Sequence, residues 1–152
     1  MRLVIQRVKT ARVDVAGKTV GQIDQGLFVL LGIHQEDSSK DVDWLIQKLV
    51  KIRIFNDEQG KMNYSVRDVQ GQLLVVSQFT LYAACKKGNR PSYTRAARPE
   101  QAIPLYEEFI AKAEAELGQK VASGQFGADM QIELNNDGPV TIILDSRTPE
   151  IF

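Results

Sequence analysis

The segment Leu27–Ile33, with the sequence LFVLLGI, is the feature that most restricts how this 152-residue chain folds. Nearly every residue in it is apolar, so it lacks the alternation of a strand with one face in water. It is also too short for a typical buried helix. The segment therefore predicts a strand that is covered on both faces. Two further apolar strands are expected at Leu3–Ile5 and Ala11–Val15, with turns at the glycines 17, 21 and 26.

Two helices are expected from apolar stripes at helical spacing. The first follows the N-cap candidates at positions 37–39, and its stripe consists of Val42, Leu45, Ile46, Leu49 and Val50. The second spans Pro99 to Leu117, where Pro104 should either kink the helix or mark the start of regular bonding.

The remaining pattern predicts strands. A long strand from Gln72 to Tyr82 would place Ser77 and Phe79 on one face and Gln78 and Thr80 on the other. Two final strands are expected near 130–134 and 140–144, and the tail 146–152 has no usable pattern. The predicted fold is a single α/β (α+β) domain over residues 1–145, in which mostly antiparallel sheets form a barrel-like layer packed by two helices.

Composition excludes several classes of protein. Nineteen basic and nineteen acidic residues leave no net charge, which argues against a wholly basic nucleic-acid binder but allows a local basic patch. The single cysteine, Cys85, cannot form an internal disulfide. No apolar run approaches the roughly 20 residues that span a bilayer, and the first apolar residues are too few for a signal peptide. A cytoplasmic protein without a membrane partner is expected.

The usual catalytic groups are scarce. The single histidine, His34, directly follows a buried strand and is expected to be a structural residue rather than a general base. One histidine and one cysteine far apart cannot supply a zinc site, and no phosphate-binding loop is present. Neither a metal nor a cofactor is therefore expected. A site in this chain would depend on positioning and on backbone amides aimed at developing charge.

Two polar motifs stand out. The first is SQFTL, in which Ser77, Gln78, Phe79 and Thr80 follow an apolar strand; it is either an emerging strand end or one wall of a pocket. The second is NDGPVT at positions 136–141. It is either a hairpin turn, for which Asp-Gly is a common signal, or a site where a cis Gly138-Pro139 bond aims two carbonyl oxygens in one direction.

These two motifs, together with Gln6-Arg7 in the first strand, closely resemble those of the D-aminoacyl-tRNA deacylases (D-tyrosyl-tRNA deacylases). Supporting stretches lie throughout residues 1–145: Arg53-Ile54-Phe55, Gly60-Lys61-Met62-Asn63, Arg90-Pro91-Ser92 and Ala128-Asp129-Met130. The resemblance implies a homodimer that hydrolyses the ester between a D-amino acid and the terminal adenosine of tRNA. It also implies activity on glycyl-tRNA, including glycine mischarged on the alanine tRNA. The aminoacylated acceptor end of tRNA is the expected partner, and DNA is not.

Carried over residue by residue, the resemblance makes Ser77, Gln78, Phe79 and Thr80 the catalytic pocket. It makes Arg7, Asn136, Gly138 and Pro139 substrate-binding residues, with a cis Gly138-Pro139 reaching across from the partner subunit and Arg7 holding that loop. Crowding by the two carbonyl groups would then exclude an L-side chain while admitting D-residues and glycine.

Several alternatives stay open. Thr80 is either a nucleophile or, as we prefer because no base lies near it in sequence, a donor beside an oxyanion hole, with the tRNA 2′-hydroxyl assisting attack. The chain could instead be a noncatalytic tRNA-binding dimer. It could also be a related editing deacylase for an L-aminoacyl-tRNA, with a trans Gly-Pro bond.

A loop rich in basic residues follows the SQFTL motif. Five basic residues and no acid lie between positions 86 and 98. The loop is either an ordinary solvated segment or a phosphate-binding patch for the acceptor end, because such patches position nucleic acid without reading its sequence. The second interpretation assigns tRNA phosphate contacts to Lys86, Lys87 and Arg90.

Overall fold

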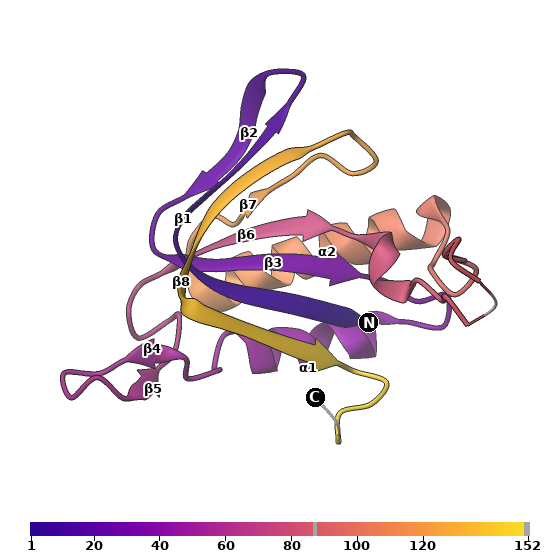
Figure 1. The fold of residues 1–152 in the computed structure, drawn as a ribbon. Coiled ribbons are helices and arrows are strands. Elements are labelled where there is room, and N and C mark those ends of the chain that lie inside the picture. Colours follow the sequence, from indigo (N-terminus) through magenta and orange to yellow (C-terminus); the bar gives the residue numbers. More distant parts are fainter. Residues whose placement is uncertain (87, 151–152) are drawn as a thin grey trace.

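The computed structural model describes residues 1–86 and 88–150 of the chain. Figure 1 shows one curled sheet with both helices on the same side of it. The strands are β1 (Arg2–Val15), β2 (Lys18–Ile23), β3 (Gly26–Gly32), β4 (Phe55–Asn56), β5 (Met62–Tyr64), β6 (Gln72–Ser77), β7 (Ala122–Ser123) and β8 (Gln131–Asp145). The helices are α1 (Ser39–Leu49), the short 3-10 helix η1 (Phe79–Tyr82) and α2 (Pro99–Leu117). Among the residues described, no helix is long and apolar enough to cross a membrane.

The sheet is organised around the long strand β1. Its order is β2-β1-β3-β6-β7, and β8 also pairs with β1. β8 runs antiparallel to β1 over nearly its whole length, whereas β3 pairs with the first half of β1 and β2 with the second half. Because two different strands share one edge of β1, the sheet curls instead of staying open, as Figure 1 shows. The predicted fold class, a barrel-like and largely antiparallel layer packed by two helices, is confirmed.

The two parallel pairings follow from the two helices. β3 pairs in parallel with β6, and β6 with β7. Parallel neighbours need a crossover connection, usually a helix. Here α1 lies between β3 and β6 in the chain, and α2 lies between β6 and β7. Both crossovers return on the same face, so the helices pack against each other and against the sheet.

Two hydrophobic cores lie on the two faces of the sheet. Leu27, Val29 and Leu31 point into the core beneath the helices, which also contains the predicted stripe of α1. Phe28 points the other way, into a smaller core with Leu74 and Val76 inside the curl. The prediction that Leu27–Ile33 is covered on both faces is therefore confirmed.

Several expected turns and breaks were wrong. The segments Leu3–Ile5 and Ala11–Val15 are parts of one continuous strand, β1. Gly21 does not form a turn but lies inside β2, where it touches the far edge of the sheet. A Cβ at this position would lie 2.6 Å from the Ser123 carbonyl oxygen, so glycine is needed for the curl to close. The short β4–β5 hairpin was not predicted.

The expected strand from Gln72 to Tyr82 is shorter than predicted. β6 ends at Ser77, and residues 79–82 form η1. The Gln78 amide donates to the Leu31 carbonyl at 2.8 Å, and the Leu81 amide then donates back to the Gln78 carbonyl at 3.3 Å. This turn removes the predicted alternation, under which Gln78 and Thr80 would have shared one wall opposite Ser77 and Phe79.

The last part of the chain is a single strand rather than a hairpin. β8 continues from Gln131 to Asp145, and irregular pairing with β1 accommodates residues 136–141. The interpretation of Asp137-Gly138 as a turn between two paired strands was therefore wrong. The Gly138-Pro139 peptide bond is cis.

Candidate functional site

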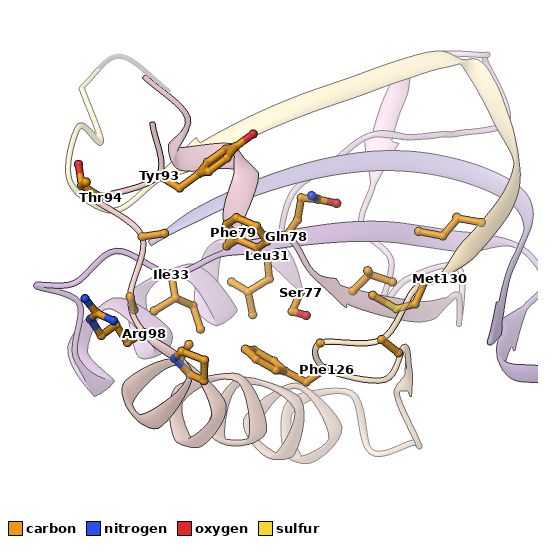
Figure 2. A pocket seen from close by; sticks show the side chains of 18 residues that line it. Leu31, Ile33, Ser77, Gln78, Phe79, Tyr93, Thr94, Arg98, Phe126 and Met130 are labelled. Atoms are coloured by element: carbon orange, nitrogen blue, oxygen red, sulfur yellow. The ribbon is translucent and has the colours of Figure 1, made fainter. Parts of the chain in front are cut away.

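A pocket of about 770 Å³ opens where β3 and β6 end and α2 begins. In α/β sheets, ligands commonly bind beyond the carboxyl ends of parallel strands. Most of the lining is apolar, as expected for a site that takes up a ligand of small-molecule size. Figure 2 shows how side chains from four separate parts of the chain surround this space. They belong to the end of β3, the end of β6 with the start of η1, the segment that leads into α2, and the segment that leads into β8.

One wall consists of Val76 and the three residues of the predicted motif that follow it, Ser77, Gln78 and Phe79. The turn after β6 brings all three to the same space, which an extended strand could not do. Thr80, the fourth residue of the predicted catalytic set, does not line the pocket. Its hydroxyl instead accepts a short hydrogen bond from the Gln78 side-chain amide. The structure therefore places Thr80 behind Gln78, where it orients that side chain.

The facing wall is formed by residues 93–102, which are tied to the end of β3 by backbone hydrogen bonds. The Ala97 amide donates to the Ile33 carbonyl at 2.9 Å, and the Gln35 amide donates to the Arg95 carbonyl at 3.1 Å. Pro99 and Ala102 from the first turn of α2 complete this wall. The wall is thus built by backbone contacts, and its side chains are free to face a ligand.

His34 lies close to the pocket but does not line it. It is only 7% exposed, and its ring packs edge-to-face against Tyr82 with the centroids 5.2 Å apart. The Glu36 amide donates to the His34 Nδ1 atom at 3.1 Å. Burial lowers the pKa of His34, with the nearby Arg147 charge acting in the same direction. The side chain is therefore a neutral hydrogen-bond acceptor in a turn, as expected for a structural histidine.

Among the pocket residues that the structure describes, none is an aspartate, glutamate, histidine or cysteine. The hydrophilic side chains in the lining are Ser77, Gln78, Tyr93, Thr94 and Arg98. This arrangement can bind, orient and donate hydrogen bonds, but it has no side chain of its own that could serve as a general base near neutral pH.

The second predicted motif, NDGPVT, lies outside the pocket and is held by the buried side chain of Arg7. The guanidinium of Arg7 is buried, and it donates to the Asp137 carbonyl at 3.0 Å and to the Ile54 carbonyl at 2.6 Å. Asn136 holds the other side, because its side-chain oxygen accepts a hydrogen bond from the Val140 amide at 3.2 Å.

Gly138 and Pro139 are both exposed, and neither lines the pocket of its own chain. Within one chain, therefore, the structure does not bring the NDGPVT motif to the SQFTL motif.

The basic loop lies at the mouth of the pocket. Lys86, Arg90 and Arg95 are exposed, and so is Arg98, which lines the pocket. Lys87 lies outside the described residues. The sequence reasoning missed Tyr93, Arg98, Phe126 and Met130 as pocket residues. The aromatic residue within the basic run RPSYTRAAR was a signal that could have identified Tyr93.

The fold and the pocket together define a class: a small single-domain α/β protein with a ligand site beyond its parallel strands. Comparison with known proteins identifies the family within this class. The sequence model described as D-Tyr-tRNA(Tyr) deacylase matches residues 4–145. A protein of Cytophaga hutchinsonii named D-aminoacyl-tRNA deacylase is 59% identical over 150 residues, which cover 99% of this chain and 100% of the relative.

Two solved structures share the fold of this chain. One is described as a c-Myc DNA unwinding element binding protein; it is 42% identical, superposes with a TM-score of 0.90, and the match covers 96% of this chain and 99% of that one. The other, described as a probable eukaryotic D-amino acid tRNA deacylase, shares the fold with a TM-score of 0.83 at 16% identity, covering 94% of this chain and 97% of that one. The chain belongs to the D-Tyr-tRNA(Tyr) deacylase family, a family of hydrolases.

Proposed function

We propose that this chain removes D-amino acids from tRNA by hydrolysing the ester that joins them to the terminal adenosine. The observation that carries the proposal is the pocket wall of Ser77, Gln78 and Phe79 facing an apolar cavity large enough for an aminoacylated nucleoside. Membership of the deacylase family supports the same reaction. A tRNA substrate is also consistent with a cytoplasmic location for the protein.

The pocket suits a substrate that has both an apolar and a polar part. The adenine ring would pack against the apolar surface that includes Leu31, Phe126 and Met130. The ester and the α-amino group would face Ser77 and Gln78, because polar groups removed from water need hydrogen-bond partners. Binding both parts fixes the reacting carbonyl relative to the wall, and such positioning contributes strongly to rate.

The reaction is the addition of water to the ester carbonyl carbon. The bond between that carbon and the ribose oxygen then breaks, the ribose oxygen takes up a proton, and the free amino acid leaves. The amides of Phe79 and Thr80, at the start of η1, make no hydrogen bond to another described residue. They are therefore available to stabilise the negative charge that develops on the carbonyl oxygen.

Thr80 serves this reaction as a positioning residue in our proposal. Its hydroxyl accepts from Gln78, and the described lining contains no base that could activate it. A threonine hydroxyl without a base is a weak nucleophile. We therefore assign assistance of the attack to the 2′-hydroxyl of the tRNA, which neighbours the ester.

Selection against L-residues would come from a second copy of the chain. Gly138 and Pro139 are exposed and lie outside the pocket of their own chain. In a homodimer, each Gly138-Pro139 segment would enter the partner's pocket, with Arg7 and Asn136 keeping it in place. Its carbonyl groups would crowd one direction at the α-carbon, so that only hydrogen fits there. D-residues and glycine, including glycine mischarged on the alanine tRNA, would pass.

The basic loop would hold the acceptor end. Lys86 and Arg90 are exposed on the loop that leads to Tyr93 and Arg98 of the pocket, and contacts to phosphates add affinity without sequence preference. Binding of tRNA should therefore weaken as salt rises. A fragment with only one nucleoside should be much less sensitive to salt.

The decisive experiment is hydrolysis of D-tyrosyl-tRNA and L-tyrosyl-tRNA by the purified protein, each with and without EDTA. Cleavage of the D-ester alone, unaffected by chelator, is the expected result. Tight tRNA binding without cleavage would instead favour a noncatalytic tRNA-binding dimer. Cleavage of the L-ester would indicate an editing deacylase of different specificity.

A further inference from the structure

Two partly exposed aromatic rings, those of Phe79 and Tyr93, belong to the lining of the pocket. Phe79 is 57% exposed and Tyr93 is 38% exposed. Their ring centroids are 5.1 Å apart and their planes meet at 78°. Figure 2 shows both rings above the cavity, with the Tyr93 hydroxyl directed away from it.

The pair is held firmly although it is exposed. Phe79 begins η1, and the C-cap residue Ala83 donates its amide hydrogen to the Thr80 carbonyl at 3.0 Å. Tyr93 follows Ser92, which exchanges two backbone hydrogen bonds with Ala84 at 2.8 and 2.9 Å. In an edge-to-face pair, one ring presents its edge to the face of the other, so large ring faces remain uncovered. Uncovered ring faces next to a hydrogen-bonded backbone are suited to stacking another flat group.

Three arginines near the pair have no carboxylate partner within the part of the chain that the structure describes. Arg90, Arg95 and Arg98 make no ion pair with any carboxylate of the described residues. The arginines outside this loop that do pair with a carboxylate are Arg2, Arg7, Arg12, Arg67 and Arg147. Uncovered aromatic faces next to unpaired arginines are the combination that binds single-stranded nucleic acid, in which bases stack and phosphates pair with the cations.

We propose that the Phe79–Tyr93 pair is a stacking platform for the nucleotide that precedes the terminal adenosine of tRNA. The inference rests on the proposed function. If the ester lies against Ser77 and Gln78, the terminal nucleoside fills the cavity and the strand must leave through the mouth. The preceding base then meets the ring of Tyr93, and its phosphate approaches the arginines. Stacking tolerates any base, so the platform holds the strand without selecting among tRNAs.

The test compares D-tyrosyl esters of adenosine, of the dinucleotide cytidylyl-adenosine and of full tRNA. In the unaltered protein, adding the cytidine should raise kcat/KM, mainly through a lower KM. In Tyr93→Ala this gain should shrink by about 5- to 150-fold, which is the range that one stacked base provides. Tyr93→Phe should retain the gain, because the ring face remains.

A dinucleotide with an abasic residue in place of cytidine sharpens the test. It should lose most of the gain with the unaltered protein and lose no more with Tyr93→Ala, since both changes remove the same stacking interaction. Met62→Ala, which removes an exposed side chain on the β4–β5 hairpin, is the matched control and should leave the gain unchanged.

The outcomes separate the two proposals. If the unaltered protein cleaves none of the D-esters, the proposed function fails. If it cleaves them but the gain from cytidine is the same in Tyr93→Ala, the platform is overturned while the deacylase survives. The platform is equally overturned if the abasic dinucleotide is cleaved as well as the one that carries cytosine.

Discussion

The Gly138-Pro139 segment and the mouth of the pocket are both exposed, yet they are supported in different ways. Beneath Gly138-Pro139, the buried Arg7 guanidinium binds the carbonyl groups of Asp137 and Ile54. At the mouth, backbone hydrogen bonds hold Ala84 and Ala97, and the side chains of Lys86, Arg90 and Arg95 are exposed to water.

The difference agrees with the tasks we propose for the two regions. A segment that rejects substrates by steric contact must not yield when an L-side chain presses on it, and a buried cation with several partners makes yielding costly. A mouth that receives a flexible strand gains from side chains that adapt to phosphates. The predictions below test two points. The first is whether the Gly138-Pro139 segment depends on the buried Arg7 side chain. The second is whether the charged side chains at the mouth can be changed without altering the stability of the fold.

The largest effect is expected from Arg7→Met. The substitution leaves the Asp137 and Ile54 carbonyl groups without their donor, and the free energy of unfolding should fall by roughly 3 kcal/mol. The ratio of D- to L-tyrosyl-tRNA hydrolysis should fall as well, because the Gly138-Pro139 segment loses the side chain that supports it. Urea unfolding followed by circular dichroism gives the first quantity and deacylation assays give the second.

Arg12→Met is the matched control on the same strand. Its side chain is 42% exposed and pairs with acidic residues at the surface, so the cost should stay below about 1 kcal/mol. Equal losses of unfolding free energy in the two variants would show that Arg7 has no special role in supporting the Gly138-Pro139 segment.

A smaller effect is expected from Gly138→Ala. Its φ is +127°, and an added Cβ would lie 2.9 Å from both the Arg7 Nη2 atom and the Val140 Cγ2 atom. The variant should lose about 1–3 kcal/mol of stability and should cleave D-tyrosyl-tRNA more slowly. Gly60→Ala separates strain from crowding, since Gly60 also has a positive φ but has open space around it. If Gly60→Ala costs as much stability as Gly138→Ala, crowding against Arg7 contributes nothing.

Tyr106→Phe tests a position that belongs to neither region. The Tyr106 hydroxyl donates to the Val75 carbonyl at 3.0 Å, and its loss should cost about 1 kcal/mol at neutral pH. Burial raises the pKa of Tyr106 to about 12. An unfolded tyrosine ionises near pH 10, so this contribution is complete below about pH 10 and is lost as the pH rises toward 12.

The measurement for Tyr106 is urea unfolding at a series of pH values from 7 to 12. Between about pH 10 and 12 the unaltered protein should lose stability more steeply than Tyr106→Phe. Parallel curves would show that the hydroxyl is not protected from ionisation in the folded state.

The smallest effect on stability is expected for the double variant Lys86→Gln and Arg90→Gln. Both side chains are exposed and form no ion pair with a described residue, so the free energy of unfolding should change by less than about 0.5 kcal/mol. The KM for D-tyrosyl-tRNA should rise. The dependence of binding on salt should weaken by about 0.7 in the log-log slope for each phosphate that the loop no longer neutralises.

Arg67→Gln, which removes a surface arginine paired with Glu116, should leave the salt dependence unchanged and serves as the control for Lys86 and Arg90. A double variant that binds tRNA with the original salt dependence would show that the basic loop is only a solvated surface. In that case the contrast between the two exposed regions would have no functional meaning.

Much of the fold could be predicted because burial leaves a local pattern. Leu27–Ile33 was expected to be covered on both faces, and it lies between the two cores. The stripe that begins at Val42 was expected to be helical and packs under the sheet in α1. In each case the buried positions recur at the period of the helix or strand, so a single sequence is enough to show which face is buried.

The parts that could not be predicted depend on distant partners. The strand after Gln72 ends at Ser77, and the Gln78 amide bonds to Leu31, 47 positions earlier in the chain. β8 passes through Asp137-Gly138 without turning back, although that dipeptide favours a hairpin, because β1 supplies pairing on both sides of it. Local propensity was overridden in both places by bonds to another segment.

The sequence by itself determined which chemical groups this protein has: one histidine, one cysteine, two polar motifs and a basic loop with an aromatic residue in it. It also determined, through periodicity, which faces of most elements are buried. Only the tertiary structure decided that Leu31, Phe79, Arg98 and Met130 surround one cavity, and that Gly138 lies away from it. Periodicity records whether a side chain is covered but not by what, because any apolar surface of the right shape satisfies the hydrophobic effect equally well.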